Sequence, residues 1–489
     1  MTAVIAATSL VAAPPERGRL PAPADAVAAA WYDVRTLPPE LRPRTRYLSL
    51  YNLPSRERTE AARVLSFHAN SLSREPDIVP PALLADGTLL RVNLSDYGWD
   101  ADTWEKLAQA DPYFHTAVET EEEFDRDYGH YDRFGRFVVT ETRRESRKVK
   151  KVVLAPWLAE SAAEQKAIAG LVRLTRSQGP VLRADWFFRR TAIQEGDAVG
   201  YYDFLGVGKK RADFEEAVGA DLGLAKRLKK EVAGVILRST VALNNRRLVR
   251  FATVSGAYWQ TLDAKANLDR RNFARVLDDG FAFDASEVIA SLPNGLHAYF
   301  LANSKGVRQD TAPDFIASDA TASGTDRRVH AGLSCIRCHG AAGGIQDIDE
   351  WVRRLVAPPL ALQSPDYDKL KRLRQLYLGD LRRQVRKDRE QYADAVKRAN
   401  GLTPLANARL YARWWDRYQE QDLDLARIER ELGVPRARVV AALRATSRKA
   451  GALDPVLAGL LQDKELPIRS EQWEEVFAQA MSAVRGYQP

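Results

Sequence analysis

The segment "SEVIASLPNGLHAYFLANSKGVRQD", residues 286–310, contains the clearest strand signal in this chain of 489 residues. Two runs of β-branched, aromatic and small apolar residues flank Pro-Asn-Gly at 293–295, and a second turn follows at 303–306. Asn-Gly between two apolar runs is a strong short-range indication of a β-hairpin. We therefore expect a hairpin region at 286–310, shortly before the most distinctive motif of the chain.

That motif is "GLSCIRCHG", residues 332–340, which contains both cysteines of the chain. Cys335 and Cys338 are three positions apart, and His339 follows directly. A c-type haem is held by two cysteine thioethers at this spacing, and the adjacent histidine is the proximal ligand of the iron. We expect one covalent haem c bound through Cys335 and Cys338, with His339 as the proximal iron ligand.

Two other interpretations of the motif stay open. A zinc site needs a fourth ligand and usually a second Cys/His pair at fixed spacing, which the sequence does not contain. A redox-active dithiol is expected near the start of a thioredoxin-like βαβ unit, and it gives His339 no role. Haem attachment is favoured over both. With only two cysteines, the fold cannot rest on a disulfide framework, so packing must stabilise it.

The sixth ligand of the iron is the open question. The only methionines are Met1 and Met481, both far from the motif in sequence, so His/Met ligation is disfavoured and His/His ligation or an open sixth position is expected. The other histidines of the chain are the candidates: His68, His115, His130, His297 and His330. His297 is a weak candidate because it lies in the hairpin shortly before the haem segment.

Composition and periodicity divide the chain into four parts. The expected parts are a signal-like segment and Pro-rich linker at 1–45, an N-terminal α+β domain at 46–285, a β-hairpin and haem c attachment region at 286–364, and a helical C-terminal domain at 365–489. The fold class we expect is therefore α+β, with an N-terminal mixed α/β domain, a haem c segment and an all-helical C-terminal domain. The apolar stretch at 3–13 resembles a secretory signal but lacks its basic n-region.

Local patterns place individual elements along the chain. Apolar residues at helical or alternating spacing predict the type of each element. The expected elements are helices at 55–72 and 100–114, a strand at 88–94, strands at 137–142 and 149–154 joined by a charged turn, a helical pair at 213–237, and a long amphipathic helix at 365–401.

The formal charge of +8 predicts a basic surface, which favours contact with acidic proteins, polyanions or anionic membranes. No nucleic-acid-binding module is present in the sequence, so we do not expect nucleic acid as a partner. We expect a redox partner protein of acidic character. The basic segment 369–398 is more typical of a solvated helix face than of a membrane-docking surface, and peripheral membrane contact is the alternative.

Four segments also resemble a known family. These are "RYLSLYNLP" (46–54), "GTLLRVNLSDYGWDADTWEKL" (87–107), "LPNGLHAYFLANSKGVRQDTAPDFIASD" (292–319) and "GLSCIRCHG" (332–340). Together they are similar to large planctomycete-type bacterial c-type cytochromes with a single CxxCH motif. The resemblance covers roughly residues 45 to 345.

The resemblance implies a single haem c and an extracytoplasmic location. It assigns the thioethers to Cys335 and Cys338 and proximal ligation to His339. The position of His297 is often Gln in that family, which weakens His297 as a ligand.

The expected function is that of an exported, periplasmic monohaem c-type cytochrome that transfers one electron at a time. Covalent haem c is attached outside the bacterial cytoplasmic membrane, which strengthens the expectation of export. One alternative is a haem enzyme or small-ligand sensor with an open sixth iron position. Another is an envelope-associated binding protein in which haem is structural.

Overall fold

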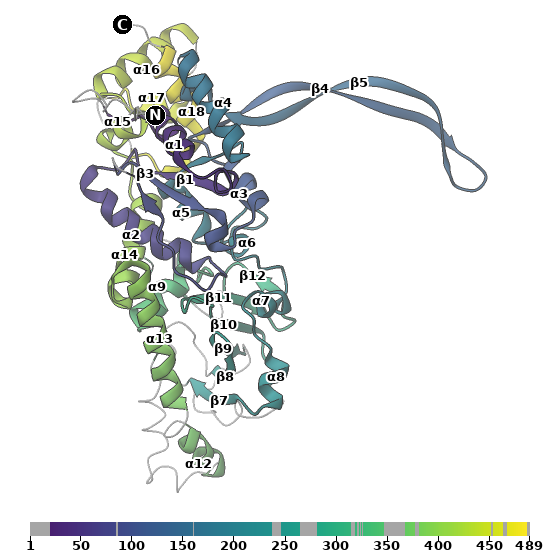
Figure 1. The fold of residues 1–489 in the computed structure, drawn as a ribbon, viewed down its shortest axis with the longest axis vertical. Coiled ribbons are helices and arrows are strands. Elements are labelled where there is room, and N and C mark those ends of the chain that lie inside the picture. The colour runs from purple at the N-terminus through teal and green to yellow at the C-terminus, as the bar shows by residue number, and fades with distance from the viewer. Residues whose placement is uncertain are drawn as a thin grey trace, which may run out of the picture.

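The computed structural model has a mixed α+β fold, with mixed sheets in the N-terminal part and a helical C-terminal region (Figure 1). It describes residues 20–84, 87–159, 161–236, 246–264, 281–313, 318–319, 322, 324, 326–346, 367–376, 381–450, 453–462 and 467–486. The signal-like stretch at 3–13 lies outside these residues. Among the helices that are described, none is long and apolar enough to cross a membrane.

The N-terminal sheet is built from strands far apart in sequence. Its order is β2-β3-β1-β6, with β1 antiparallel to β3 and parallel to β6. The strands are β1 (Thr45–Ser49), β2 (Ala82–Leu83), β3 (Leu89–Asn93) and β6 (Val181–Arg183). The surrounding helices are α1 (Pro23–Thr36), α2 (Ser55–Ser71), α3 (Ala101–Ala108), α4 (Ala162–Thr175), α5 (Ala184–Thr191) and α6 (Tyr201–Phe204). Every residue of β1 is buried, which places this sheet in the core.

Part of the segment expected as a linker is a packed helix. Residues 23–36 form α1 because the sequence is alanine-rich and has proline at its first turn, where the missing N–H costs nothing. The Asp25 carboxylate accepts a hydrogen bond from the Ala22 N–H and closes the helix start. Ala30 and Val34 are fully buried. The prediction of a linker at 14–45 is therefore wrong for this stretch.

A long two-stranded arm, β4 (His115–Tyr131) paired with β5 (Phe137–Leu154), projects from the body (Figure 1). Two short strands joined by a charged turn were expected in the second half of this arm, but β5 runs through the charged residues. Arg144 and Arg147 lie opposite acidic residues of β4, and Arg147 donates a hydrogen bond to Glu122 at 3.0 Å. Cross-strand pairing of opposite charges keeps this polar stretch in strand conformation.

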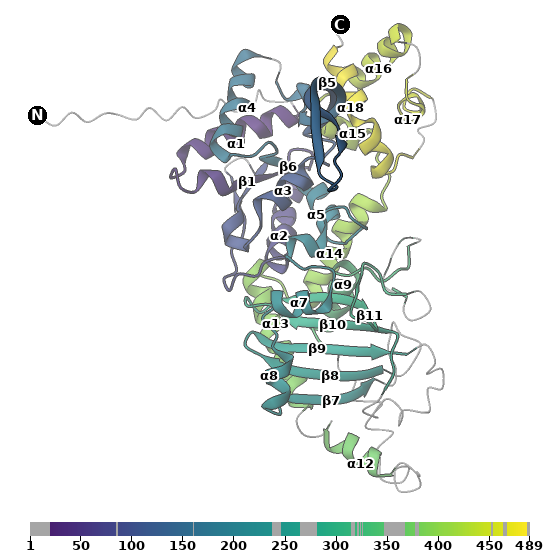
Figure 2. The same ribbon diagram turned by 90° about the vertical axis from the view of Figure 1, so that its right-hand side faces the viewer.

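The expected hairpin at 286–310 is confirmed and belongs to a six-stranded antiparallel sheet of order β12-β11-β10-β9-β8-β7 (Figure 2). Its strands are β7 (Glu231–Ile236), β8 (Arg246–Thr253), β9 (Gly256–Asp263), β10 (Ala285–Ser291), β11 (His297–Asn303) and β12 (Arg308–Gln309). The domain boundary expected between 285 and 286 falls within this sheet, in β10.

The helical pair expected at 213–237 is only partly confirmed. Residues 211–217 and 222–227 form α7 (Arg211–Ala217) and α8 (Leu222–Arg227), but 231–236 form β7. Apolar residues of α7 pack on one face of the sheet, where Phe214 stacks on Phe300 with ring centroids 4.9 Å apart. The opposite face meets α9 and α13.

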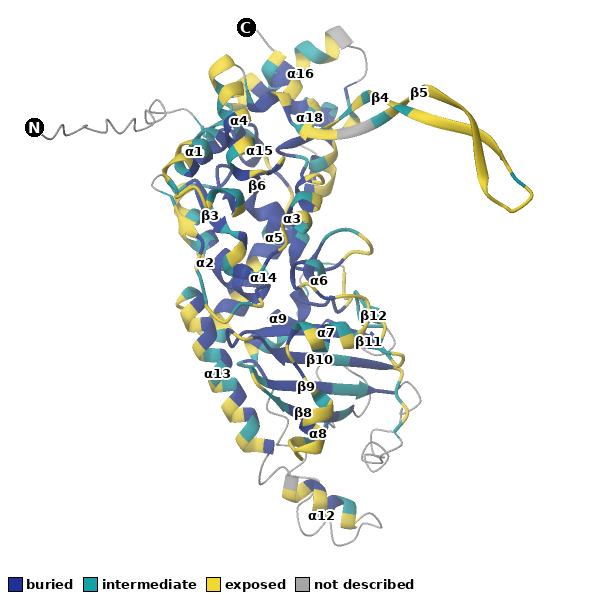
Figure 3. Cartoon of the chain, turned by 45° about the vertical axis from the view of Figure 1, so that its right-hand side comes forward, coloured by how far each residue is buried: buried dark blue, intermediate teal, exposed yellow. Residues whose placement is uncertain are grey.

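The helical region contains α9 (Leu333–Ala341), α12 (Tyr367–Leu376), α13 (Arg382–Asn400), α14 (Pro404–Gln419), α15 (Leu425–Leu432), α16 (Arg436–Ala450), α17 (Pro455–Gly459) and α18 (Ser470–Gly486). The long helix expected at 365–401 corresponds to α12 and α13, and 377–380 lies outside the described residues. It ends where expected, because Gly401 takes the left-handed conformation at φ 76°. Figure 3 shows the buried residues concentrated along the body and the arm exposed.

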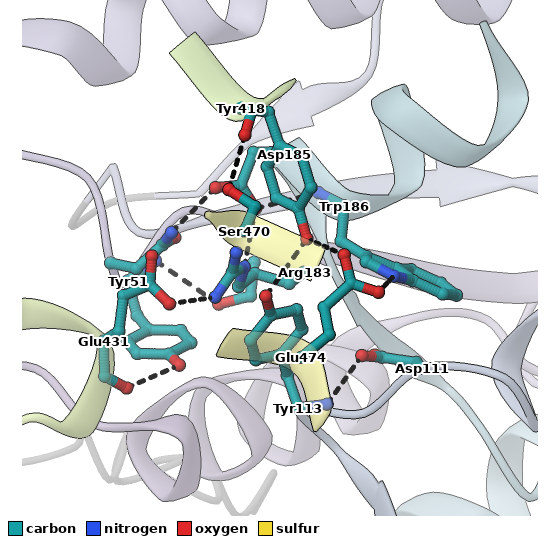
Figure 4. Close-up of polar contacts among 12 residues, drawn as sticks. Tyr51, Asp111, Tyr113, Arg183, Asp185, Trp186, Tyr418, Glu431, Ser470 and Glu474 are labelled. Atoms are coloured by element: carbon teal, nitrogen blue, oxygen red, sulfur yellow. Dashed lines mark hydrogen bonds and ion pairs between the residues drawn. The ribbon is translucent and has the colours of Figure 1, made fainter. Parts of the chain in front are cut away.

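A buried guanidinium joins the N-terminal sheet to the C-terminal helices (Figure 4). Arg183, at the end of β6, donates to Asp185 at 2.7 Å and to Glu431 of α15 at 2.6 Å, and its side chain is fully buried. Its Cζ lies 3.3 Å from the centre of the Tyr113 ring. The Trp473 indole N–H donates to the same Glu431 carboxylate at 2.6 Å. Charges removed from water need such compensation to be tolerated.

We expect Glu431→Gln to lower the free energy of unfolding by about 3–5 kcal/mol, because it keeps the shape but leaves a buried cation undercompensated. Urea unfolding followed by circular dichroism measures this loss. Glu141→Gln removes the exposed carboxylate that pairs with Arg143 on the arm and serves as the matched control. The prediction fails if both variants unfold at the wild-type urea concentration.

Candidate functional site

A small hollow of about 70 Å³ lies between the six-stranded sheet, α9 and the start of α13. Apolar side chains form much of its wall: Leu248, Trp259, Ile289, Val329, Ile345 and Val385. It is much smaller than the range of about 300–1,000 Å³ that is typical of small-molecule and cofactor sites. What distinguishes the hollow is therefore the chemistry of the residues that line it and not its size.

The CxxCH motif forms α9, and all three of its chemically active residues line the hollow. Cys335, Cys338 and His339 are spaced at i, i+3 and i+4, which places them on one helix face. Cys335 is buried and Cys338 is partly exposed, and no disulfide joins them. The structure thus brings together all three residues that the motif predicts for haem attachment.

Gly332 lets the chain turn sharply, in close contact with its neighbours, where α9 begins. Gly332 has φ 83°, and a Cβ there would lie 2.6 Å from the Ala192 carbonyl oxygen and 2.7 Å from the Tyr201 ring. At the other end of α9, a Cβ on Gly340 would lie 3.0 Å from Cβ of Ala408 in α14. The helix therefore fits closely between α14 and the loop that follows α5.

The two ring nitrogens of His339 have different surroundings. Nδ1 lies 3.0 Å from the carbonyl oxygen of Gly344, and because a carbonyl only accepts, Nδ1 carries the proton of the neutral ring. Nε2 lies 3.7 Å from Oε1 of Glu287, with which it forms an ion pair when the ring is protonated. Histidines that bind metals are commonly oriented by such an Nδ1–H bond. The orientation of His339 is suited to ligation through Nε2.

A buried charge cluster borders the hollow. Arg246 donates to both oxygens of Asp263, at 2.5 and 2.9 Å, and to Oε2 of Glu287 at 2.7 Å. Burial raises the pKa of Glu287, but Arg246 and His339 together outweigh it and lower that pKa to about 2. Glu287 is therefore an ionised carboxylate in an otherwise largely apolar pocket.

Glu287 and Arg246 were not found by sequence analysis. Glu287 is the single charged residue of "ASEVIAS", the strand at 285–291, and by alternation it shares a face with Ile289. A charge on the inner face of an apolar strand is the signal that could have identified it. Arg246 had no comparable signal, because it sits among other basic residues at 246–250.

The weak ligand candidate His297 lies near His339 but does not line the hollow. Its ring stacks on Tyr392 of α13, with centroids 4.2 Å apart. A Cβ on Gly344 would come within 3.2 Å of the His297 ring, so His297 lies against the loop that anchors Nδ1 of His339. Burial, and secondarily His339, lowers the pKa of His297 to about 3. His297 thus lies beside the Nδ1 side of His339.

None of the other candidate histidines, all of them described, lines the hollow. His68 is buried between Tyr411 and Thr191, with nitrogen–oxygen distances of 2.9 and 2.7 Å. His330 lies 2.9 Å from an Asp326 oxygen, and His115 and His130 belong to the arm. Met481 is buried within α18.

The thiol environment bears on the other two interpretations of the motif. Burial raises the pKa of the Cys335 thiol well above its ordinary value, whereas redox-active dithiols have lowered pKa values. Among the described residues, no group of three or more His, Cys, Asp or Glu side chains is arranged to hold a metal ion. A buried thiol with a raised pKa, such as that of Cys335, is not typical of a redox-active dithiol.

Comparisons of the chain with protein families, curated proteins and solved structures find no match. The resemblance to planctomycete-type cytochromes stays a prediction that rests on the four quoted segments.

We expect Gly344→Ala to destabilise the fold by about 1–3 kcal/mol, because Gly344 has φ 108° and a Cβ would lie 2.8 Å from the Tyr392 ring. Urea unfolding measures this loss. Gly223→Ala, in α8, is the matched control, since its nearest neighbour would be 3.4 Å away and its backbone is not in the left-handed region. Equal stability of the two variants would contradict the prediction.

We expect stability to fall as pH drops below about 6.5, partly because of His68. Burial lowers the pKa of His68 to about 3, so the unfolded chain binds a proton there that the folded chain does not. Between about pH 6 and 4, each pH unit costs about 1.4 kcal/mol at this site. In urea unfolding against pH, His68→Gln should reduce the slope by that amount, and an unchanged slope would contradict the assignment.

Proposed function

We propose that this chain is a monohaem c-type cytochrome that binds one covalent haem through Cys335 and Cys338 and transfers one electron at a time. The observation that carries this proposal is the meeting of both cysteines and His339 at one largely apolar hollow. The three residues come from a single helix, and much of the wall comes from strands β7 to β10 and from Val385 of α13, which are about 50 to 100 residues away in sequence.

The residues present fit a haem c group. Two unbridged cysteines supply the sulfur atoms for thioethers, and the Nδ1–H bond to Gly344 orients His339 for proximal ligation. The walls are largely apolar, but the hollow holds only about 70 Å³ in this structure, so the elements around it would have to separate for a macrocycle to enter. When bound, the haem supplies an iron that changes oxidation state by one electron.

The exposure of the three motif residues bears on how an electron would reach the iron. Cys335 is buried, whereas Cys338 and His339 are partly exposed, so one edge of the hollow approaches the surface. An edge near the surface favours electron exchange with a partner protein over reaction inside a closed pocket. The formal charge of +8 favours an acidic redox partner.

An extracytoplasmic location follows from the same proposal. Covalent haem c is attached outside the bacterial cytoplasmic membrane, so a chain that carries it has to be exported. The resemblance of the four segments to planctomycete-type cytochromes supports the same location. This part of the proposal therefore depends on haem attachment.

We expect the protein, coexpressed with a bacterial haem c maturation system, to retain haem after denaturing electrophoresis and to give a c-type reduced absorption spectrum. Cys335→Ala/Cys338→Ala should abolish the retained haem, and His339→Ala should keep covalent haem but change the spectrum through loss of the proximal ligand. His130→Ala, on the exposed arm, is the matched control and should behave like wild type. Wild-type protein without covalent haem would refute the proposal.

Carbon monoxide distinguishes electron transfer from ligand chemistry in the same preparation. A six-coordinate electron carrier should bind carbon monoxide weakly or not at all in its reduced form. Rapid and tight binding would instead favour a haem enzyme or a small-ligand sensor with an open sixth position.

A further inference from the structure

The far end of the β4–β5 arm exposes a group of large apolar side chains (Figure 3). Tyr131 and Phe134 are 72% and 67% exposed, and the neighbouring Phe137, Val138 and Val139 are between 40% and 46% exposed. Tyr131 and Phe137 lie opposite each other on the two strands, with ring centroids 5.2 Å apart. An exposed apolar group of this kind is typical of an interaction site.

The part of the arm between this tip and the body is strongly charged. Six of the nine residues at 119–127 are acidic, and 141–148 include four basic residues. The strands are 17 and 18 residues long, which at about 3.3 Å per residue gives an arm of about 55 Å. Because the exposed aromatic rings are concentrated at its end, the arm is suited to a target that is touched end-on rather than one that pairs along the ribbon.

The turn at the tip pairs much of its main chain internally. Oδ1 of Asp132 accepts hydrogen bonds from the N–H groups of Phe134 and Arg136, at 2.8 and 3.0 Å. The Asp132 N–H donates to the Arg136 carbonyl at 2.9 Å, and the Gly135 N–H donates to the Asp132 carbonyl at 3.0 Å. Main-chain groups that are already paired can leave water at low cost, which is what entry into a lipid interface requires.

The charges at the tip favour an anionic surface. Within 128–140 the one acidic residue is Asp132, and its side chain is only 22% exposed because it binds the turn and Arg136. Cζ of Arg133 and of Arg136 lie 4.8 and 5.3 Å from the centre of the Phe134 ring. The tip therefore presents aromatic rings together with guanidinium groups, a combination that is typical of segments at the level of lipid headgroups.

We propose that the tip of the arm, residues 128–139, docks this protein on the surface of an anionic lipid bilayer. The rings of Tyr131, Phe134 and Phe137 insert at the level of the headgroups, and Arg133 and Arg136 bind lipid phosphates. The charged part of the arm stays in water between the bilayer and the body. This docking surface is separate from the basic segment 369–398, and it is independent of haem attachment.

The test is co-sedimentation of the full-length chain with vesicles of phosphatidylcholine and phosphatidylglycerol in equal parts. Wild type should bind these vesicles, and it should bind vesicles of phosphatidylcholine alone more weakly. Phe134→Ser/Phe137→Ser should lower the partition coefficient at least about tenfold, because two large apolar side chains no longer leave water. Arg133→Gln/Arg136→Gln should weaken binding to the anionic vesicles only, because it removes the attraction to lipid phosphates.

Leu228→Ser/Val254→Ser is the matched control and should bind like wild type. It removes two exposed apolar side chains from the body, one after α8 and one in the β8–β9 turn. Far-UV circular dichroism checks folding, and the arginine variant, which keeps every apolar residue of the tip, is the second variant if the phenylalanine variant fails to fold.

Two results would overturn the inference. One is wild type that binds neither kind of vesicle, even if the same tip then proves to bind an acidic protein. The other is unchanged binding to anionic vesicles in both tip variants, which would assign membrane contact to another surface, such as the segment 369–398. Neither result bears on covalent haem, which is read from the gel.

Discussion

The fold depends on one guanidinium that water cannot reach. Arg183 ends β6, the edge strand that pairs in parallel with β1, and its charge is compensated by Asp185 and by Glu431 of α15. A buried cation is tolerated only when its partners are held in place, so the sheet and the C-terminal helices have to fold against each other. Tyr418 of α14 and Trp473 of α18 belong to the same network, which extends the constraint through the helical region.

Helix α14 connects the Arg183 network to the proposed haem site. One end of α14 carries Tyr418 in the Arg183 network, and the same helix packs on α9 where Gly340 meets Ala408. The position of the CxxCH helix is therefore set by elements at both ends of the sequence. The six-stranded sheet then supplies the opposite wall of the hollow, to which Arg246 and Glu287 contribute.

Sequence analysis predicted those features that are encoded locally. The hairpin at 286–310 follows from Asn-Gly between apolar runs, and the end of α13 follows from Gly401. The full length of β5 could not be predicted, because the charged residues in its middle are held in strand conformation by acidic residues on β4. Likewise α1 was predicted to be part of a linker. Its alanines and first-turn proline favour a helix, but the distant elements that bury Ala30 and Val34 could not be seen in the sequence.

The same distinction applies to the site. Cys335, Cys338 and His339 are adjacent in sequence, so their meeting needs only a helix. Glu287 comes within 3.7 Å of His339 only because β10 and α9 are folded together. Sequence analysis could not find this contact, because it depends on how a strand packs against a helix about 50 residues away.

The charge pattern of the β4–β5 arm has a consequence for how copies of this chain meet. In sequence, β4 carries six acidic residues against one basic residue, and β5 carries six basic residues against two acidic ones. A two-stranded ribbon leaves main-chain hydrogen-bonding groups open along both margins, which is a template for adding strands. If the arms of two copies paired through the same strand, like charges would lie side by side and repel. Within one arm, in contrast, the acidic residues of β4 face the basic residues of β5 and attract them.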